Sequence, residues 1–456
     1  MLFQSQFFIL VFLPASLLAY YLVAASAPRR QWVLIAASLF FYGWWDVRFI
    51  PLLLGQIGAT WVLALLAART NRRAFLIVGI CVNLISLGTF KYLDFALKSL
   101  AAVTATTLPH ANIILPIGIS FFSFQLISYL VDRLRDDAPI YPFRQFAVFV
   151  MLFPHLIAGP IVRHNELIPQ FAEDPRRPGL WQRVSIGLML FTLGFAKKVL
   201  LGDMLAGTVN TVFANAGTRP LDFGEAWTGA LGFSFQLFLD FSAYTEMAIG
   251  MALLFGLLLP ENFRRPYLAR DLSDFWRRWH ISLSRFMRDY LYIPLGGSRA
   301  GRVRYVLAAM ITMGLCGLWH GAGWTYVVWG LWHGAGLVVC RAWKSVTRPM
   351  PGVLAWAITM LFVLAGWVLF RASDIGTALS ILGSLGGLHG FAGRLQEIPL
   401  LIIAAAVSVL VPSAHEIKGG ILRPQPRLAT IAAIVALICI FRVGKEELVP
   451  FIYFQF

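Results

Sequence analysis

Residues 223–258 read FGEAWTGALGFSFQLFLDFSAYTEMAIGMALLFGLL, and this stretch decides the class of fold. It contains only three charged residues, Glu225, Asp240 and Glu246. A helix needs about 20 predominantly apolar residues to cross the hydrocarbon core of a bilayer. Such a long and apolar stretch therefore indicates a helix embedded in a membrane.

The rest of the 456-residue chain has the same character, with 59% apolar and 13% charged residues and a mean hydropathy of +0.73. A soluble domain carries about 25% charged residues. The other candidate spans are 7–25, 31–45, 49–68, 74–93, 113–131, 184–201, 306–318, 324–341, 353–370, 398–411 and 428–441. We expect the shorter ones, such as 31–45 and 306–318, to be tilted, broken or interfacial. The sequence predicts an all-α, polytopic membrane protein with one membrane-embedded domain over residues 1–456.

The net charge of +16 does not indicate nucleic-acid binding, because the positive residues lie in short runs between apolar segments. Cytoplasmic loops of membrane proteins carry an excess of Lys and Arg. The arginines that follow the first, third and fifth candidate spans are Arg29, Arg30, Arg69, Arg72, Arg73, Arg133, Arg135 and Arg144. These ends are therefore predicted to be cytoplasmic, with the N-terminus on the outer side.

Cysteine usage indicates neither a disulfide framework nor a zinc site. Cys81, Cys316, Cys340 and Cys439 lie in apolar segments and form no CxxC pair. Cys316 and His320 are four residues apart, so a thiol–imidazole pair on one helix face stays open, although a buried cysteine usually serves packing. We expect no metal and no resident cofactor.

Two regions interrupt the pattern of regular spans. Residues 146–160, FAVFVMLFPHLIAGP, contain two prolines that break a helix, and broken backbone at membrane depth needs protein or a cavity around it. We predict a re-entrant segment beside a cavity, with His155 in it. Residues 262–304 interleave arginines with aromatic residues, four of which share one helical face: Phe275, Trp279, Phe286 and Tyr290. This pattern predicts a basic amphipathic helix at the cytoplasmic surface, with Ser273 as its N-cap.

Residues 314–334, GLCGLWHGAGWTYVVWGLWHG, contain Leu-Trp-His-Gly twice, around His320 and His333. Ionisable groups inside spans usually face a protein interior or a water-filled cavity, and imidazole suits proton transfer near neutral pH. The alternative for each histidine is a packed, hydrogen-bonded role. The glycine-rich break favours function for His320, whereas regular surroundings favour packing for His333. For His280, which ends FWRRWH, both interpretations remain open.

Asp240 and Glu246 are the acidic residues deepest in the stretch quoted first. They are six residues apart and do not share a face of a regular helix. This spacing argues against an acid–base pair or a metal site. We expect them to hold arginines or hydroxyl groups inside the bundle.

Three stretches carry a resemblance to a known family: FPHLIAGPIVR (153–163), DFWRRWHISLSRFMRDYLYIPLGGSR (274–299) and GLWHGAGWTYVVWGLWHG (317–334). The sequence resembles the membrane-bound O-acyltransferase family. Within that family, the sequence is most similar to the bacterial alginate O-acetylation membrane proteins. The resemblance reaches from the N-terminus to His333, with a family-like core at about residues 110–345. AYTE at 243–246 and Cys316 depart from the branch, which commonly has GYSD and Gly there.

The resemblance implies a bundle of about 11–14 helices around a tunnel. It implies a catalytic histidine at His320 and a second polar position at His280. An acyl thioester, here cytosolic acetyl-CoA, would donate an acetyl group to a hydroxyl of an exported, alginate-like polysaccharide or of a periplasmic transferase partner, across the bacterial inner membrane. Residues expected along the substrate path are Trp276, Arg277, Arg278, Arg285, Arg288, Trp319, Asp240, His155 and His333. The four arginines fit CoA phosphates and anionic lipid head groups equally well.

Two other classes of function share the sequence features. A transporter or channel would also contain broken helices and intramembrane histidines, but the chain has no internal repeat beyond Leu-Trp-His-Gly. A non-catalytic scaffold could recruit an extracellular transferase. The acceptor, the partner and the oligomeric state are not fixed by the sequence.

Overall fold

The computed structural model describes residues 1–109, 111–135, 138–346, 350–421, 425–445 and 449–454, and all regular structure within these ranges is helical. The all-α prediction is therefore confirmed. The α-helices are α1 (Leu13–Leu22), α2 (Ala27–Gly43), α3 (Ile50–Thr70), α4 (Ala74–Leu87), α5 (Leu93–Thr104), α6 (Ile119–Leu134), α7 (Phe143–Met151), α8 (His164–Leu167), α9 (Leu180–Lys197), α10 (Asp203–Ala216), α11 (Phe223–Leu254), α12 (Leu272–Arg278), α13 (Ile281–Met287), α14 (Arg302–His320), α15 (Trp324–Val346), α16 (Gly352–Arg371), α17 (Ile375–Leu385), α18 (Ile398–Leu410), α19 (Ala414–Lys418) and α20 (Pro426–Val443).

Short turns of π- or 3₁₀-helix join or extend several of these helices. Those that matter for the site are η3 (Gly88–Tyr92), η5 (Lys198–Gly202), η7 (Arg288–Tyr292) and η8 (Ile452–Phe454). Because η3 and η5 are π-helical, α4 continues into α5, and α9 into α10, as single long helices with a local change of register.

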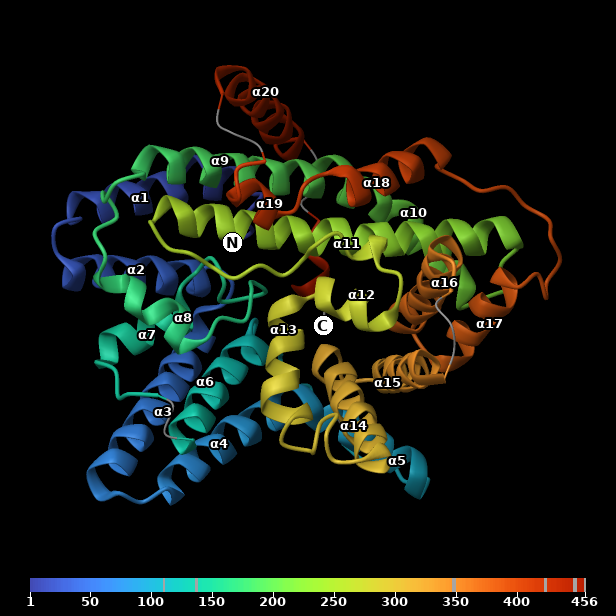
Figure 1. The fold of residues 1–456 in the computed structure, drawn as a ribbon, viewed down its shortest axis with the longest axis horizontal. Helices are drawn as coiled ribbons and strands as arrows, with labels where there is room; N and C mark the ends of the chain where they lie inside the picture. The colour runs from blue at the N-terminus through green and yellow to red at the C-terminus, as the bar shows by residue number, and fades with distance from the viewer. Residues whose placement is uncertain (110, 136–137, 347–349, 422–424, 446–448, 455–456) are drawn as a thin grey trace.

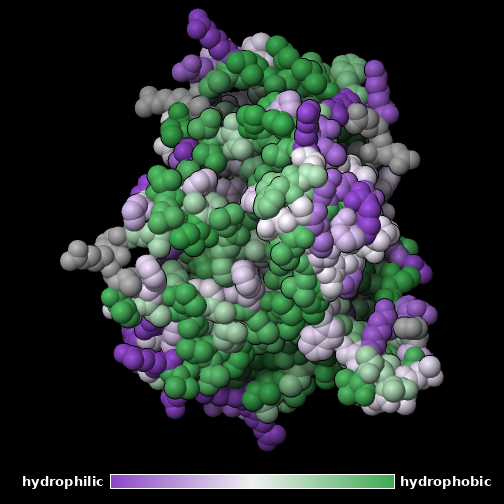
Figure 2. All heavy atoms as spheres, turned by 90° about the vertical axis from the view of Figure 1, so that its right-hand side faces the viewer, coloured by the Kyte–Doolittle hydropathy of each residue, from purple (hydrophilic) through white to green (hydrophobic). Residues whose placement is uncertain are grey.

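Seven helices of the described chain are long and apolar enough to cross a membrane. They are Val47–Thr70, Ala74–Thr104, Leu180–Ala216, Phe223–Leu254, Arg302–His320, Gly352–Arg371 and Pro426–Val443. Figure 2 shows that hydrophobic side chains cover most of one side of the molecule, while hydrophilic side chains gather toward its margins. This is the surface of a multi-pass membrane protein, as predicted.

The stretch that decided the fold is α11, which is buried along its whole length. It crosses the middle of the molecule with α9 and α10 packed along it (Figure 1). The contact with α9 is close, because a Cβ on Gly250 would lie 2.5 Å from the carbonyl oxygen of Gly187. The helix therefore faces protein on all sides rather than lipid.

Asp240 and Glu246 pair with lysines, not with the arginines that we expected. Lys197 Nζ donates to Glu246 Oε1 at 2.6 Å, and Lys198 Nζ donates to Asp240 Oδ1 at 2.5 Å. All four side chains are buried. Ion pairing satisfies charges that would be costly in an apolar interior, so these residues tie α9 and η5 to α11.

The predicted break at residues 146–160 is confirmed. Helix α7 ends at Met151, and the chain continues in turns, with every residue from 146 to 162 buried. A Cβ on Gly118, whose φ is +77°, would lie 2.8 Å from the carbonyl oxygen of Leu156, so the broken segment packs directly on the start of α6. Protein therefore surrounds the irregular backbone, as its depth in the membrane requires.

The prediction of one amphipathic helix within residues 262–304 is wrong. The backbone breaks between α12 and α13, where Trp279 is extended and His280 adopts a left-handed conformation with φ of 42°. Trp279 and His280 are 1% and 0% exposed. Burial of these two aromatic rings in the bundle, which the helical spacing cannot reveal, accounts for the break. The N-cap of α12 is Asp271, whose side chain accepts from Asp274 N, rather than Ser273.

Candidate functional site

The site is built around the end of α14, where the first Leu-Trp-His-Gly motif stops the helix at His320. Gly317 allows α14 to touch α15, since a Cβ there would lie 2.1 Å from the carbonyl oxygen of Tyr326. Gly321 then takes extended backbone, with φ of −158°. The glycines of this motif therefore bring the backbones together, and His320 sits at the last turn of a helix held close to its neighbour.

The carbonyl groups at this helix end are capped by two residues of η3. Lys91 Nζ donates to the carbonyl oxygens of Trp319 at 2.5 Å and His320 at 3.3 Å, and Tyr92 Oη donates to that of Leu318 at 2.9 Å. The last carbonyls of a helix lack partners within the helix and favour a cation nearby. Lys91 and Tyr92 therefore fix the position of the His320 backbone.

Aromatic rings enclose the His320 imidazole, which is 3% exposed. Ring centroids of Trp329, Phe370 and Tyr453 lie 5.2, 5.3 and 5.7 Å from it. Its Nδ1 is buried and has no hydrogen-bond partner among the described residues. The ring is therefore held by packing rather than by a polar network, which leaves it available to a substrate.

A small cavity of about 190 Å³ opens beside His320. We call it the His320 cavity; its lining residues are Trp45, Lys91, Leu115, Pro116, Ile117, Gly118, Ile119, Ser120, Phe121, Ile157, Trp319, His320 and Tyr453. Ile157 comes from the broken segment, so the prediction that this segment lies beside a cavity is confirmed. Lys91 contributes the one basic side chain of this lining.

A larger cavity of about 980 Å³ approaches α14 from another side, and we call it the arginine funnel. Its basic lining residues are Arg264, Arg277, Arg278, Arg285, Arg288, Arg341 and Lys344. Trp276, Tyr292 and Tyr305 add aromatic surface, and Cys316 belongs to its lining. Cys316 lies one helical turn before His320, so the funnel and the His320 cavity meet α14 within a single turn.

Ion pairs hold basic side chains at the rim of the funnel, among them those of Arg285 and Arg288. Arg285 Nη1 lies 3.2 Å from Glu166 Oε1, and Arg288 Nε lies 2.6 Å from Asp289 Oδ1. Burial raises the pKa of Asp289, but hydrogen bonds from Arg288 and Arg163 outweigh it and bring that pKa below its ordinary value. Asp289 therefore stays ionised at neutral pH and keeps the arginines in place.

His280 lies deep in the bundle next to His320, with ring centroids 6.3 Å apart. The left-handed backbone at the α12–α13 break aims its ring inward, against Phe241 at 4.8 Å. Both ring nitrogens are buried without a hydrogen-bond partner in the described part of the chain. The two predicted histidines are thus brought together, and His280 lines neither cavity.

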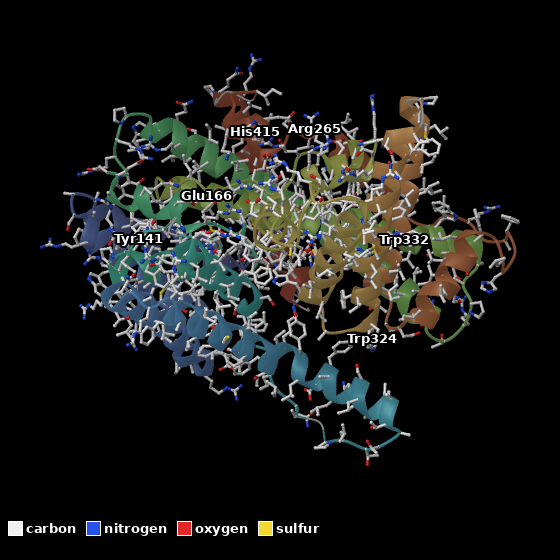
Figure 3. The ribbon with its side chains drawn as sticks, turned by 60° about the horizontal axis from the view of Figure 1, so that its bottom comes forward. Tyr141, Glu166, Arg265, Trp324, Trp332 and His415 are labelled. Carbon is white, nitrogen blue, oxygen red and sulfur yellow. The ribbon has the colours of Figure 1, made fainter. Side chains whose placement is uncertain are left out.

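The other candidates separate into two groups. Trp319 lines the His320 cavity, and Trp276 and the four arginines line the funnel. In contrast, His333 packs between Trp276 and Trp329 at 5.2 and 4.9 Å, and His155 Nδ1 lies 3.2 Å from Gln125 Nε2. Figure 3 labels Trp324 and Trp332, which belong to the same helix as His333, α15. Neither histidine, nor Asp240, lines either cavity, so the structure supports packing or structural roles for these three residues.

Sequence reasoning missed two residues of the site, Lys91 and Tyr453. A lysine inside an apolar span is a signal that could have revealed Lys91, because such residues usually face a cavity. Tyr453 carries no comparable signal, since a tyrosine among apolar residues is commonly a packing residue. Within the described ranges, no group of three His, Cys, Asp or Glu side chains is placed to hold a metal ion.

Comparison with known proteins now identifies the family. The sequence profile of the membrane-bound O-acyltransferase family matches residues 119–373, and the chain belongs to that family. It is 40% identical to the peptidoglycan O-acetyltransferase of Helicobacter pylori, over 86% of this chain and 80% of that protein. It is 37% identical to a probable alginate O-acetylase of Pseudomonas putida over the full length of both. A teichoic acid D-alanyltransferase of Bacillus subtilis is 29% identical over 58% of this chain and 70% of its own. The protein is therefore a membrane O-acyltransferase related to bacterial alginate and peptidoglycan O-acetylating proteins.

Proposed function

We propose that this acyltransferase takes an acetyl group from acetyl-CoA in the cytosol and passes it at His320 to a hydroxyl group on the outer side of the inner membrane. The observation that supports this most directly is the position of His320 between two cavities of different chemistry. One is wide and basic, as a nucleotide thioester requires. The other is small and reaches the imidazole itself.

The sidedness rests on Arg135, which belongs to an end that the charge pattern predicts to be cytoplasmic. Arg135 Nη2 donates to the carbonyl oxygen of Asp289 at 3.3 Å, and its guanidinium lies over the Tyr290 ring at 5.4 Å. Both residues belong to η7, at the rim of the funnel. Leu115 and Trp45 line the His320 cavity. Trp45 ends the second predicted span and Leu115 lies at the start of the fifth, and both of these span ends are predicted to be on the outer side. The funnel would then face the cytosol and the N-terminus the periplasm.

The donor would bind with its phosphates on the funnel arginines. Arginine forms bidentate, charge-assisted hydrogen bonds with phosphate oxygens. Arg277 is 66% exposed and its contact with Asp274 is long, at 3.4 Å, so it is free to turn toward a ligand. The pantetheine arm would then run along the apolar floor of the funnel toward Cys316. Because the basic groups line a concave space rather than a flat face, we favour CoA over lipid head groups.

In the reaction, the hydroxyl oxygen of the acceptor attacks the thioester carbonyl carbon. His320 takes the hydroxyl proton as general base, the carbon–sulfur bond breaks, and the thiolate leaves and is protonated to CoA. General base catalysis contributes roughly 10²–10⁴-fold. His280 would orient the thioester or polarise its carbonyl group, which gives a role to ring nitrogens that otherwise lack partners among the described residues.

The acceptor would be an exported polysaccharide, such as an alginate-like polymer, or a hydroxyl of a periplasmic transferase partner. At about 190 Å³, the His320 cavity is smaller than ligand pockets of roughly 300–1,000 Å³. It has room for one hydroxyl-bearing group but not for several sugar units.

The role of His320 is tested by replacing the histidine of each Leu-Trp-His-Gly copy in turn and comparing the two variants. Purified wild type, His320→Ala and His333→Ala would be incubated with labelled acetyl-CoA and an acceptor extract, and both thioester consumption and product label would be followed. We expect His320→Ala to fold and to lose at least about 100-fold in transfer rate. His333→Ala, which removes an equally buried imidazole from the same motif, should keep its rate once folded. Normal acetylation by His320→Ala would defeat the assignment.

A further inference from the structure

The last described segment of the chain, residues 449–454, is threaded into the interior of the bundle. Phe451 and Ile452 are 1% and 6% exposed. The side-chain amide of Gln4 donates to the carbonyl oxygen of Val449 at 3.0 Å, so the segment also touches the opposite end of the chain. A short stretch with one turn of 3₁₀-helix has little internal stability, and other parts of the protein must hold it.

The buried ion pair of Lys198 and Asp240 contacts this segment directly. Asp240 Oδ2 accepts from the backbone N–H of Ile452 at 2.8 Å, and Lys198 Nζ donates to the carbonyl oxygen of Pro450 at 3.3 Å. The ammonium also lies 4.6 Å from the ring centroid of Phe451. Both members of the pair therefore contact residues 449–454, in addition to joining η5 to α11.

These contacts fix the position of Tyr453, which directly follows Ile452 in the chain. Its ring centroid is 4.0 Å from that of Phe241, 5.7 Å from that of His320 and 6.3 Å from that of His280. Tyr453 also forms part of the wall of the His320 cavity. The segment thus completes the enclosure of both histidines, and a shift of it would open the site to water.

We propose that Lys198 and Asp240 are positioning residues for acyl transfer, which act by holding residues 449–454 in the wall of the His320 cavity. This inference rests on the proposed function, since it assumes that the chemistry occurs at His320. It assigns to the ion pair a role beyond the stability of the bundle. A merely structural role would tie α9 and η5 to α11 and leave the reaction unaffected.

The neighbouring ion pair of Lys197 and Glu246 is a matched control. It joins the same helices, is equally buried, and has a similar length of 2.6 Å. The Lys197 ammonium approaches the ring of Phe238 on α11, at 6.0 Å, rather than a ring of residues 449–454. Replacement of either pair should therefore lower the stability of the bundle to a similar degree. Only replacement of the Lys198 pair should release residues 449–454.

The test replaces each pair by apolar residues of similar size, because an uncompensated buried charge would unfold the protein whereas removal of both partners is often tolerated. One variant is Lys198→Met with Asp240→Leu, and Asp203→Asn is added because Lys198 also contacts Asp203 at 2.7 Å. The control is Lys197→Met with Glu246→Met. Each is also made with Ile452→Cys, in a background without the native cysteines, and the labelling of the introduced thiol by a thiol reagent is timed.

We expect the thiol introduced at position 452 to label at least about tenfold faster in the Lys198 variant than in the unaltered ion-pair background, and kcat to fall by a similar factor with KM for acetyl-CoA unchanged. The control should match that background in both readouts. Release of the segment without loss of kcat, loss of kcat without release, or equal losses in both variants would each overturn the proposal. Failure of the proposed function would appear separately, as an active His320→Ala protein.

Discussion

The close contact between α14 and α15 makes Gly317→Ala the sharpest perturbation of the site outside the histidines. A Cβ at residue 317 would lie 2.1 Å from the carbonyl oxygen of Tyr326, whereas real Cβ atoms essentially never approach within 3.0 Å. The obstacle is backbone, so the helices must separate by about 0.9 Å. Overpacking of this kind costs about 1–3 kcal/mol, which a bundle of this size should survive.

The functional effect should exceed the effect on stability, because His320 lies on the same helix less than one turn beyond Gly317. A misplacement of about 1 Å costs roughly 100-fold in rate. We therefore expect Gly317→Ala to lower kcat for acetyl transfer by about 100-fold. The donor contacts in the funnel are largely on other helices, so KM for acetyl-CoA should change little.

Gly314→Ala is the control, since it adds the same methyl group one turn earlier on α14. There the Cβ would lie 3.4 Å from Cδ2 of Leu331, an ordinary contact with the end of a flexible side chain. Both variants would be purified in detergent, checked for a monodisperse elution profile, and assayed for transfer of labelled acetyl groups. Full activity of Gly317→Ala would refute the idea that this contact sets the position of His320.

Two further predictions concern the ends of the substrate path. Lys91→Met removes the hydrogen bonds to the carbonyls of Trp319 and His320, each worth about 0.5–1.5 kcal/mol. It should lower kcat about tenfold or more at saturating donor, and wild-type kcat in a steady-state assay would count against the capping role. Arg285→Gln with Arg288→Gln should raise KM for acetyl-CoA about tenfold but leave KM for a short acetyl thioester without phosphates unchanged. If these arginines bind lipid head groups instead, the two donors will respond alike.

The features that follow local rules were predictable. The composition and the length of residues 223–258 indicate a membrane bundle without any knowledge of neighbours, and the prolines near His155 require a break wherever they lie. The glycine-rich stop at His320 likewise distinguishes one of two identical motifs as the one beside a cavity. Each of these inferences depends on a few adjacent residues and on the chemistry of the bilayer.

The features that the sequence conceals depend on contacts between distant segments. The spacing of Asp240 and Glu246 argues against a joint site, but it cannot reveal their lysine partners, which lie on α9 and η5, 49 and 42 residues away in the sequence. Phe275 and Trp279 have helical spacing although the helix ends before His280. Tyr453 is about 130 residues from His320, and its ring lies 5.7 Å from the imidazole, next to a residue whose backbone N–H donates to Asp240.

The central claim is that His320 lies between two cavities that open on opposite faces of the membrane. Ser284 lines the arginine funnel and Leu115 lines the His320 cavity, so Ser284→Cys and Leu115→Cys would be placed singly in a background without native cysteines. A membrane-impermeant maleimide would then be applied to right-side-out and to inverted membrane vesicles. We predict that the thiol at position 284 reacts only in inverted vesicles and the thiol at position 115 only in right-side-out vesicles. Reaction of both positions from the same face would contradict the account.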